Sequence, residues 1–179
     1  GAVGFLTRAP AGCDERAWNA FLAKPATIPL VGYLVGAVVA LPLFVGTWFP
    51  AIPDVSVALA AIIALYLFTG ITHIDGVADL ADAAVVHGDA DDRRAAMTDS
   101  LVGTGGVLAV AITILGLATA LIAIAALPWR ALAIVVAAEV GAKAGMALMA
   151  CFGTPAFEGM GAALTDAADS MAALPVLVV

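Results

Sequence analysis

The chain has 179 residues, of which 64% are hydrophobic and 12% charged, and its mean hydropathy is +1.11. Soluble domains are typically about 45–50% apolar and about 25% charged, so this composition indicates a protein whose solvent is the lipid bilayer. With a net charge of −7 the chain lacks the basic surface that nucleic-acid binding requires. Cys13 and Cys151 lie far apart and suggest no disulfide framework.

Four apolar windows are long enough to cross a membrane, because a hydrocarbon core about 30 Å thick needs about 20 helical residues. In chain order they cover residues 28–49, 55–74, 105–127 and 131–152. A shorter apolar run at 174–179 begins a fifth. The sequence therefore predicts a single all-α membrane domain over residues 1–179, a polytopic helical bundle of about four spans plus the start of a fifth.

Two pairs of glycines within these windows predict close contacts between helices. Gly32 and Gly36 lie four residues apart in the first window, and Gly141 and Gly145 have the same spacing in the fourth. Small residues at this spacing let helix backbones approach one another. We expect all four glycines to serve packing rather than substrate binding.

The distribution of basic residues predicts the orientation of the bundle. Cytoplasmic loops carry an excess of Lys and Arg. Five basic residues lie before the first window or between the second and third, and one lies between the third and fourth: these are Arg8, Arg16, Lys24, Arg93 and Arg94, against Arg130. The sequence thus predicts a protein of the cell membrane whose polar segments, including a site loop at about 75–104, face the cytoplasm.

The most informative segment follows the second window. Asp75, Asp79 and Asp82 are spaced i, i+4 and i+7, which puts three carboxylates on one face of a helix. Like charges at this spacing destabilise a helix by roughly 0.2–0.5 kcal/mol per pair, and no Lys or Arg lies at i±3 or i±4 to offset them. A bound Mg²⁺ would relieve the repulsion, because it binds carboxylate oxygens and completes its coordination shell with water or substrate phosphate.

The alternative interpretation of such acids is a solvated acidic surface. It suits Asp89, Asp91 and Asp92, which we expect in a polar loop beside Gly88. It suits the 75–82 stripe poorly, because that stripe is embedded in apolar residues at a membrane boundary. We therefore predict a metal site at the stripe and not at these three aspartates.

A second cluster of polar and glycine residues follows in the same segment. It consists of Arg93, Arg94, Asp99, Ser100, Gly103, Gly105 and Gly106. Glycines before a helix leave backbone N–H groups free to face an anion, at the positive end of the helix dipole. Arginine suits bidentate phosphate contacts, and the aspartate would supply a fourth metal ligand.

Four further polar residues are considered for the same site, and three of them have two interpretations. Glu139 and Lys143 lie one turn apart inside the fourth window, where ionisable residues face the protein interior or a cavity. They either pair with each other, or Lys143 faces the phosphate site. His73 is either an interfacial histidine or a substrate contact, and Glu158 is compatible with the same site.

Two motifs in the central segment resemble those of a known enzyme family. HIDGVADLAD at 73–82 followed by MTDSLVGTGG at 97–106 resembles the double motif of the cobalamin synthase family, the adenosylcobinamide-GDP ribazoletransferases. FLTRAP at 5–10, IPLVGYLVG at 28–36, a basic residue at Lys143 and EGMG at 158–161 resemble other family segments. The family's carboxy-terminal Gly-Asp motif is not found, so the resemblance implies that a longer protein contains these residues.

The resemblance implies the last assembly step of the cobalamin nucleotide loop. The ribose hydroxyl of α-ribazole, or of its 5′-phosphate, would attack the phosphorus attached to cobinamide in adenosylcobinamide-GDP, and GMP would leave. Motifs and resemblance together predict Mg²⁺ as cofactor, with Asp75, Asp79, Asp82 and Asp99 as catalytic and metal-binding residues. The predicted substrate-binding residues are Arg8, His73, Arg93, Arg94, Ser100, Gly103, Lys143 and Glu158. An oligomer is compatible with this prediction.

Two other functions compete with this one. A CDP-alcohol phosphotransferase also has an aspartate-rich membrane helix, and Gly76 and Ala78 match its pattern, but Asp79 stands where that pattern requires Arg. A cation transporter would carry acids within several spans. Here the first three windows contain no acid, and Glu139 is the one acid of the fourth.

Overall fold

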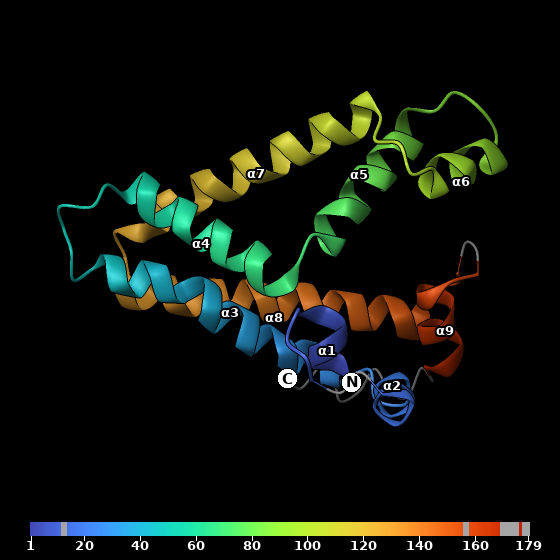
Figure 1. The fold of residues 1–179 in the computed structure, drawn as a ribbon, viewed down its shortest axis with the longest axis horizontal. Coiled ribbons are helices and arrows are strands. Elements are labelled where there is room, and N and C mark those ends of the chain that lie inside the picture. The colour runs from blue at the N-terminus through green and yellow to red at the C-terminus, as the bar shows by residue number, and fades with distance from the viewer. Residues whose placement is uncertain (12–13, 156–157, 169–175, 177–179) are drawn as a thin grey trace.

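The structure, a computed structural model, describes residues 1–11, 14–155, 158–168 and 176 (Figure 1). Every regular element in this part of the chain is a helix, which confirms the predicted all-α class. The helices are α1 (Ala2–Leu6), α2 (Glu15–Leu22), α3 (Thr27–Gly46), α4 (Asp54–Thr69), α5 (Thr72–Val85), α6 (Ala90–Thr98), α7 (Thr104–Ala125), α8 (Pro128–Phe152) and α9 (Met160–Ala167).

Three of the described helices, α3, α7 and α8, are long and apolar enough to cross a membrane. The pair α4 and α5 passes the same test jointly and makes a fourth candidate span. A helix suits the bilayer because it satisfies its own backbone hydrogen bonds. The predicted membrane bundle is therefore confirmed, whereas the expected fifth run at 174–179 lies outside the described residues except for Val176.

The second window is not one continuous helix, contrary to the expectation for residues 55–74. The chain leaves α4 at Gly70, whose φ of 76° and ψ of −166° are essentially restricted to glycine. The axis of α5 is bent by 93° from that of α4. The backbone N–H of Arg8 donates to the Phe68 carbonyl oxygen at 2.8 Å, so the amino-terminal segment braces this elbow.

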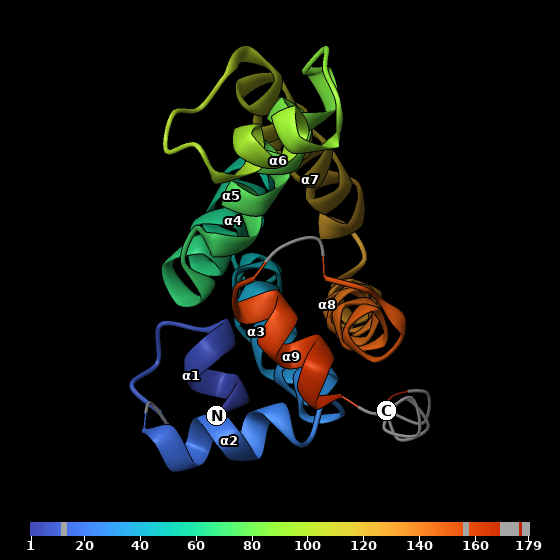
Figure 2. The same cartoon turned by 90° about the vertical axis from the view of Figure 1, so that its right-hand side faces the viewer.

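Close packing of α3 against α8, which are neighbours in Figure 2, forms the centre of the bundle. A Cβ atom added at Gly32 would lie 2.6 Å from the Cα of Val140, and one at Gly36 would lie 2.7 Å from the Cα of Val136. The packing role predicted for these two glycines is confirmed. The packing role predicted for Gly141 and Gly145 is not borne out, because a Cβ added at either would meet no atom of the described residues within 4 Å.

The amino-terminal helices cover the polar end of α3. Phe5 of α1 stacks with Trp18 and Phe21 of α2, with ring centroids 5.6 and 5.1 Å away. Asp14 caps α2 by accepting a hydrogen bond from the Ala17 N–H at 2.7 Å. These contacts fix the segment that carries Arg8 to the elbow.

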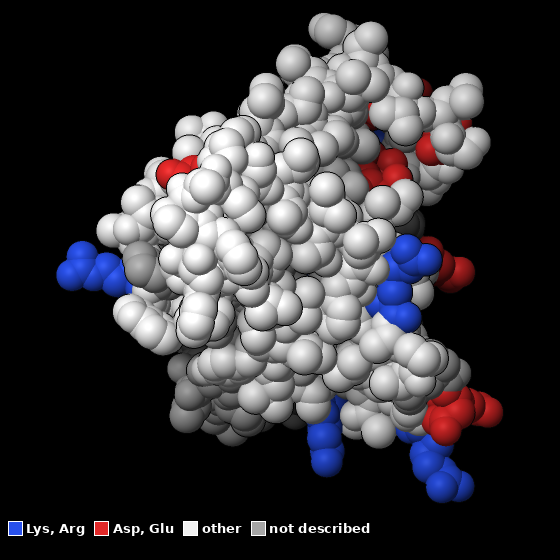
Figure 3. Space-filling model, turned by 60° about the vertical axis from the view of Figure 1, so that its left-hand side comes forward, with Lys and Arg blue, Asp and Glu red and all other residues white. Residues whose placement is uncertain are grey.

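Both short turns of the bundle lie at one end, and the polar segments lie at the other. The connections after α3 and α7 share the left end in Figure 1, whereas the amino terminus, α5, α6 and α9 lie towards the right. Figure 3 shows charged side chains gathered mainly at one end, beside a broad uncharged flank. Trp48 and Trp129 are exposed at the turns, as expected of aromatic residues at a membrane interface. The structure thus groups the polar segments as the charge pattern predicts.

Candidate functional site

The predicted acid stripe lies on α5, on a helical stretch as expected. Asp75 is exposed and Asp79 is half-buried, and within the described part of the chain neither carboxylate has a hydrogen bond or an ion pair. The two side chains are one turn apart and therefore neighbours on the helix surface. They form an uncompensated pair of negative charges at the polar end of the bundle.

Asp82, the third acid of the stripe, is fully engaged. Its Oδ2 accepts a hydrogen bond from the Gly103 N–H at 2.7 Å, and its Oδ1 accepts one from the Gly106 N–H at 2.8 Å. These donors belong to the first turn of α7, whose N-cap is Gly103. A carboxylate at a helix N-terminus typically contributes about 0.3–1 kcal/mol, and up to about 2 kcal/mol when partly buried.

Glycine at positions 103, 105 and 106 lets α7 approach α5. A Cβ at Gly106 would lie 2.5 Å from a carboxylate oxygen of Asp82, and a Cβ at Gly103 would also collide with that carboxylate. A Cβ at Gly105 would lie 2.9 Å from the carbonyl oxygen of Ala81. The glycine turn that was predicted to bind an anion therefore does bind one, and the anion is the carboxylate of Asp82.

The structure does not gather all four predicted metal ligands. Among the described residues, no three His, Cys, Asp or Glu side chains lie close enough to hold a metal ion. Asp99 lies after α6 and accepts a hydrogen bond from the Leu101 N–H at 3.1 Å, and its neighbour Ser100 is also exposed. A pair of free carboxylates still fits Mg²⁺, which usually takes one or two from the protein and completes its shell with water and phosphate.

The segment expected to be a polar loop contains the short helix α6. Asp89 is its N-cap and forms a capping box with Asp92, so the two carboxylates satisfy backbone N–H groups. Asp91 pairs with Arg94 at 2.8 Å, and both side chains are exposed. The prediction of a loop is wrong here, because these acids cap a helix. Arg93 is exposed on the same helix.

A separate cavity of about 260 Å³ lies between α4, α5, α7 and α8. His73 and Lys143 both line it, together with Glu139, and the Nζ of Lys143 lies 2.6 Å from Oε2 of Glu139. The predicted i,i+4 pair is thus present. Asp75 follows His73 by two residues, a rotation of about 200° around a helix, so the cavity and the acid stripe lie on opposite sides of α5.

Three polar residues that line this cavity were not singled out in the sequence. Tyr66, Thr69 and Thr113 belong to α4 and α7 and lie within apolar windows. The hydroxyl of Thr69 donates to the Leu65 carbonyl oxygen, which is common for threonine inside an apolar helix. Their only sequence signal is a hydroxyl amid aliphatic residues, and that signal does not separate a cavity from a helix surface.

Two predicted substrate-binding residues lie apart from the stripe and from the cavity. Arg8 is exposed, and its side-chain stem lies beside the elbow, 3.6 Å from a Cβ placed on Gly70. Gly70 precedes α5 by two residues, so the stem of Arg8 lies near the start of that helix. Glu158 precedes α9, a helix that packs against α8 and α2, and it is exposed.

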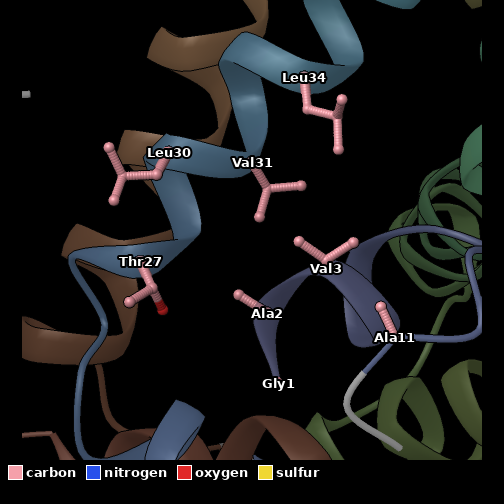
Figure 4. Close-up of a pocket in the computed structure, with 8 residues that line it drawn as sticks. All are labelled: Gly1, Ala2, Val3, Ala11, Thr27, Leu30, Val31 and Leu34. Atoms are coloured by element: carbon pink, nitrogen blue, oxygen red, sulfur yellow. The ribbon is translucent and has the colours of Figure 1, made fainter.

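A further hollow, of about 510 Å³, is apolar. It lies between the amino terminus and α3 and is lined by small and aliphatic residues (Figure 4). Its one side-chain hydroxyl, on Thr27, donates to the Lys24 carbonyl oxygen. None of the predicted site residues lines it, so it contributes no group to the proposed chemistry.

The family is decided by a match that extends over residues 1–179, to the family described as cobalamin-5-phosphate synthase. The chain belongs to this family. The resemblance inferred from the two central motifs is therefore confirmed, and with it the prediction that the chain is a membrane-embedded enzyme rather than a transporter.

Curated relatives agree with the family match. The chain is 51% identical over 185 residues to an adenosylcobinamide-GDP ribazoletransferase of Halorubrum lacusprofundi, covering 98% of this chain and 70% of the relative. It is 44% identical to the protein of the same name from Haloquadratum walsbyi, covering 99% and 70%, and 37% identical to that of Pyrobaculum calidifontis, covering 99% and 73%. No solved structure matches the chain.

Proposed function

We propose that this protein transfers adenosylcobinamide phosphate from adenosylcobinamide-GDP to α-ribazole or its 5′-phosphate and releases GMP. Family membership supports this reaction. The observation that carries the site assignment is a pair of carboxylates, Asp75 and Asp79, on a helix at the polar end of a membrane bundle, with no hydrogen-bond or ion-pair partner in the described part of the chain.

The reaction breaks the diphosphate of adenosylcobinamide-GDP. The ribazole hydroxyl oxygen forms a bond to the phosphorus attached to cobinamide and gives up its proton, while the bond from that phosphorus to the GMP oxygen breaks. Such transfers depend on positioning and on neutralising phosphate charge. Mg²⁺ held by Asp75 and Asp79 would supply that neutralisation when bound. Arg8, whose stem lies beside the elbow, and Arg93, on α6, would add guanidinium groups to the phosphate oxygens.

The reaction itself is the direct test of this proposal. Proteoliposomes containing the protein, supplied with adenosylcobinamide-GDP, α-ribazole 5′-phosphate and Mg²⁺, are expected to release GMP and to form a cobalamin phosphate in equal amounts. Replacing Mg²⁺ by an excess of chelator is expected to stop the release. The products would be separated by chromatography and quantified by their corrinoid and guanine absorbance.

A matched set of donors distinguishes the rival enzyme. If CDP-alcohols release CMP and the corrinoid donor releases no GMP, the proposal is wrong in favour of a CDP-alcohol phosphotransferase. If the protein releases GMP without forming a cobalamin phosphate, it is a hydrolase of the donor rather than a transferase.

We also propose that the site faces the cytoplasm from the cell membrane. Five of the six Lys and Arg residues outside the apolar windows support this orientation. In a variant with both native cysteines replaced by serine, His87→Cys in intact cells is expected to resist a membrane-impermeant thiol reagent, and Asp54→Cys is expected to react. Strong labelling at position 87 from outside would reverse the orientation.

A further inference from the structure

We infer that Asp82 is a positioning residue, which ties α5 to α7 so that Asp75 and Asp79 are presented to substrate. In this role Asp82 is neither a metal ligand nor part of a phosphate-binding turn. The inference rests on the proposed function for its catalytic consequence and on hydrogen-bond geometry for the tie itself.

Both carboxylate oxygens of Asp82 bind backbone N–H groups, 21 and 24 residues further along the chain. The side chain is half-buried between the helices, unlike that of Asp75, which is exposed. A carboxylate that accepts two amide hydrogens at a helix N-terminus has its negative charge offset by those donors and by the positive end of the helix dipole. It therefore needs no metal ion to offset its charge.

The three glycines provide independent support for this tie. Side chains at positions 103 and 106 would collide with the carboxylate of Asp82, and a side chain at 105 would collide with the backbone of α5. Phosphate-binding glycine turns need an open approach to their N–H groups. Here that approach is filled by Asp82, so the glycines serve the contact between helices.

The tie has a consequence for the acid stripe. α5 leaves α4 through the elbow at Gly70, and its main packing partners beyond that elbow are α6 and α7. The contact with α7 is the most extensive of these and anchors α5 to a membrane-spanning helix. Asp75 and Asp79 thus owe their position to the α5–α7 contact, and a site displaced by about 1 Å can lose about 100-fold in rate.

The activity test compares Asp82→Ala with Asp79→Asn. Asp82→Ala is expected to lower kcat by about 100-fold while leaving the Mg²⁺ concentration for half-maximal activity unchanged. Asp79→Asn is expected to raise that Mg²⁺ concentration. A rise in Asp82→Ala equal to that in Asp79→Asn would show that Asp82 is a metal ligand and would overturn the inference.

A distance measurement tests the tie without reference to activity. Spin labels at Leu80 on α5 and Leu108 on α7, each 62% exposed, would report the separation of the two helices in the full chain. Asp82→Ala and Gly103→Ala are both expected to broaden the distance distribution. An unchanged distribution in both variants would overturn the inference even if the protein proves to catalyse another reaction.

A rescue variant separates positioning from simple helix capping. Gly103→Ser in the Asp82→Ala background restores an N-cap hydroxyl that can accept from the Gly106 N–H, but it does not reconnect α5. We expect thermal stability to recover while kcat stays low. Full recovery of kcat in the double variant would show that the cap alone matters, and the positioning role would be wrong.

Discussion

Asparagine at position 75 or 79 is expected to lower the rate of transfer by about 100- to 1,000-fold, the loss seen when one preorganised electrostatic contact to a transition state is removed. Each substitution removes one carboxylate of the Asp75–Asp79 pair, neither of which has a partner among the described residues. The rate of GMP release at saturating donor and Mg²⁺ is the measurement that checks it.

The same substitutions are expected to leave the helices folded. Asparagine is nearly isosteric with aspartate, and removing one charge relieves the i,i+4 repulsion by roughly 0.2–0.5 kcal/mol. Circular dichroism in detergent should therefore show the helix content of the unmodified protein, with a melting temperature that is equal or slightly higher.

Asp89→Asn is the matched control, because it makes the same chemical change in an exposed aspartate of the same polar segment. Asp89 caps α6, and asparagine caps a helix about as well as aspartate. Transfer should continue at the normal rate. If Asp75→Asn and Asp79→Asn are as active as this control, the acid pair is not the metal site.

The apolar windows predicted the helices well where composition decides the fold. Residues 28–49 and 105–127 became α3 and α7, because a long aliphatic run in a bilayer has few alternatives to a helix. The elbow at Gly70 was not predicted. A glycine near the end of an apolar run is compatible with an unbroken helix, and only the backbone geometry shows a positive φ there. The cap at Asp89 does have a local signal in the sequence, because Asp89 lies three residues before a second acid, Asp92. This is the spacing of a capping box, and it favours a helix over the predicted loop.

In the candidate site, contacts within one helix could be predicted from the sequence, whereas contacts between helices could not. The i,i+4 spacing was sufficient to predict the Glu139–Lys143 pair, because both partners lie on one helix. It was not sufficient for Asp82, which shares its spacing with Asp75 and Asp79 but meets donors from α7. No periodicity within α5 reports which of three aligned carboxylates turns towards a neighbouring helix. For the same reason the sequence did not separate His73 from the stripe that begins two residues later.

Replacing Lys143 by methionine is expected to destabilise the protein by about 3–5 kcal/mol, the cost of leaving one member of a buried ion pair without its partner. The side chains of Lys143 and Glu139 are 6% and 17% exposed and lie 2.6 Å apart within α8. Their helix has the hydropathy of a membrane span, where an unpaired charge is costly. Denaturant unfolding in bicelles, followed by tryptophan fluorescence, would measure the loss.

The double variant Lys143→Met, Glu139→Leu decides between the two roles that the sequence left open for Lys143. Replacing a whole buried pair by apolar residues is often neutral or stabilising, so its stability should return to within about 1 kcal/mol of the unmodified protein. The cavity that Lys143 lines is on the far side of α5 from Asp75, which favours the structural role, so transfer activity should return as well. A double variant that folds normally yet transfers nothing would place Lys143 in the substrate site. A single variant as stable as the unmodified protein would show that the pair contributes nothing to the fold.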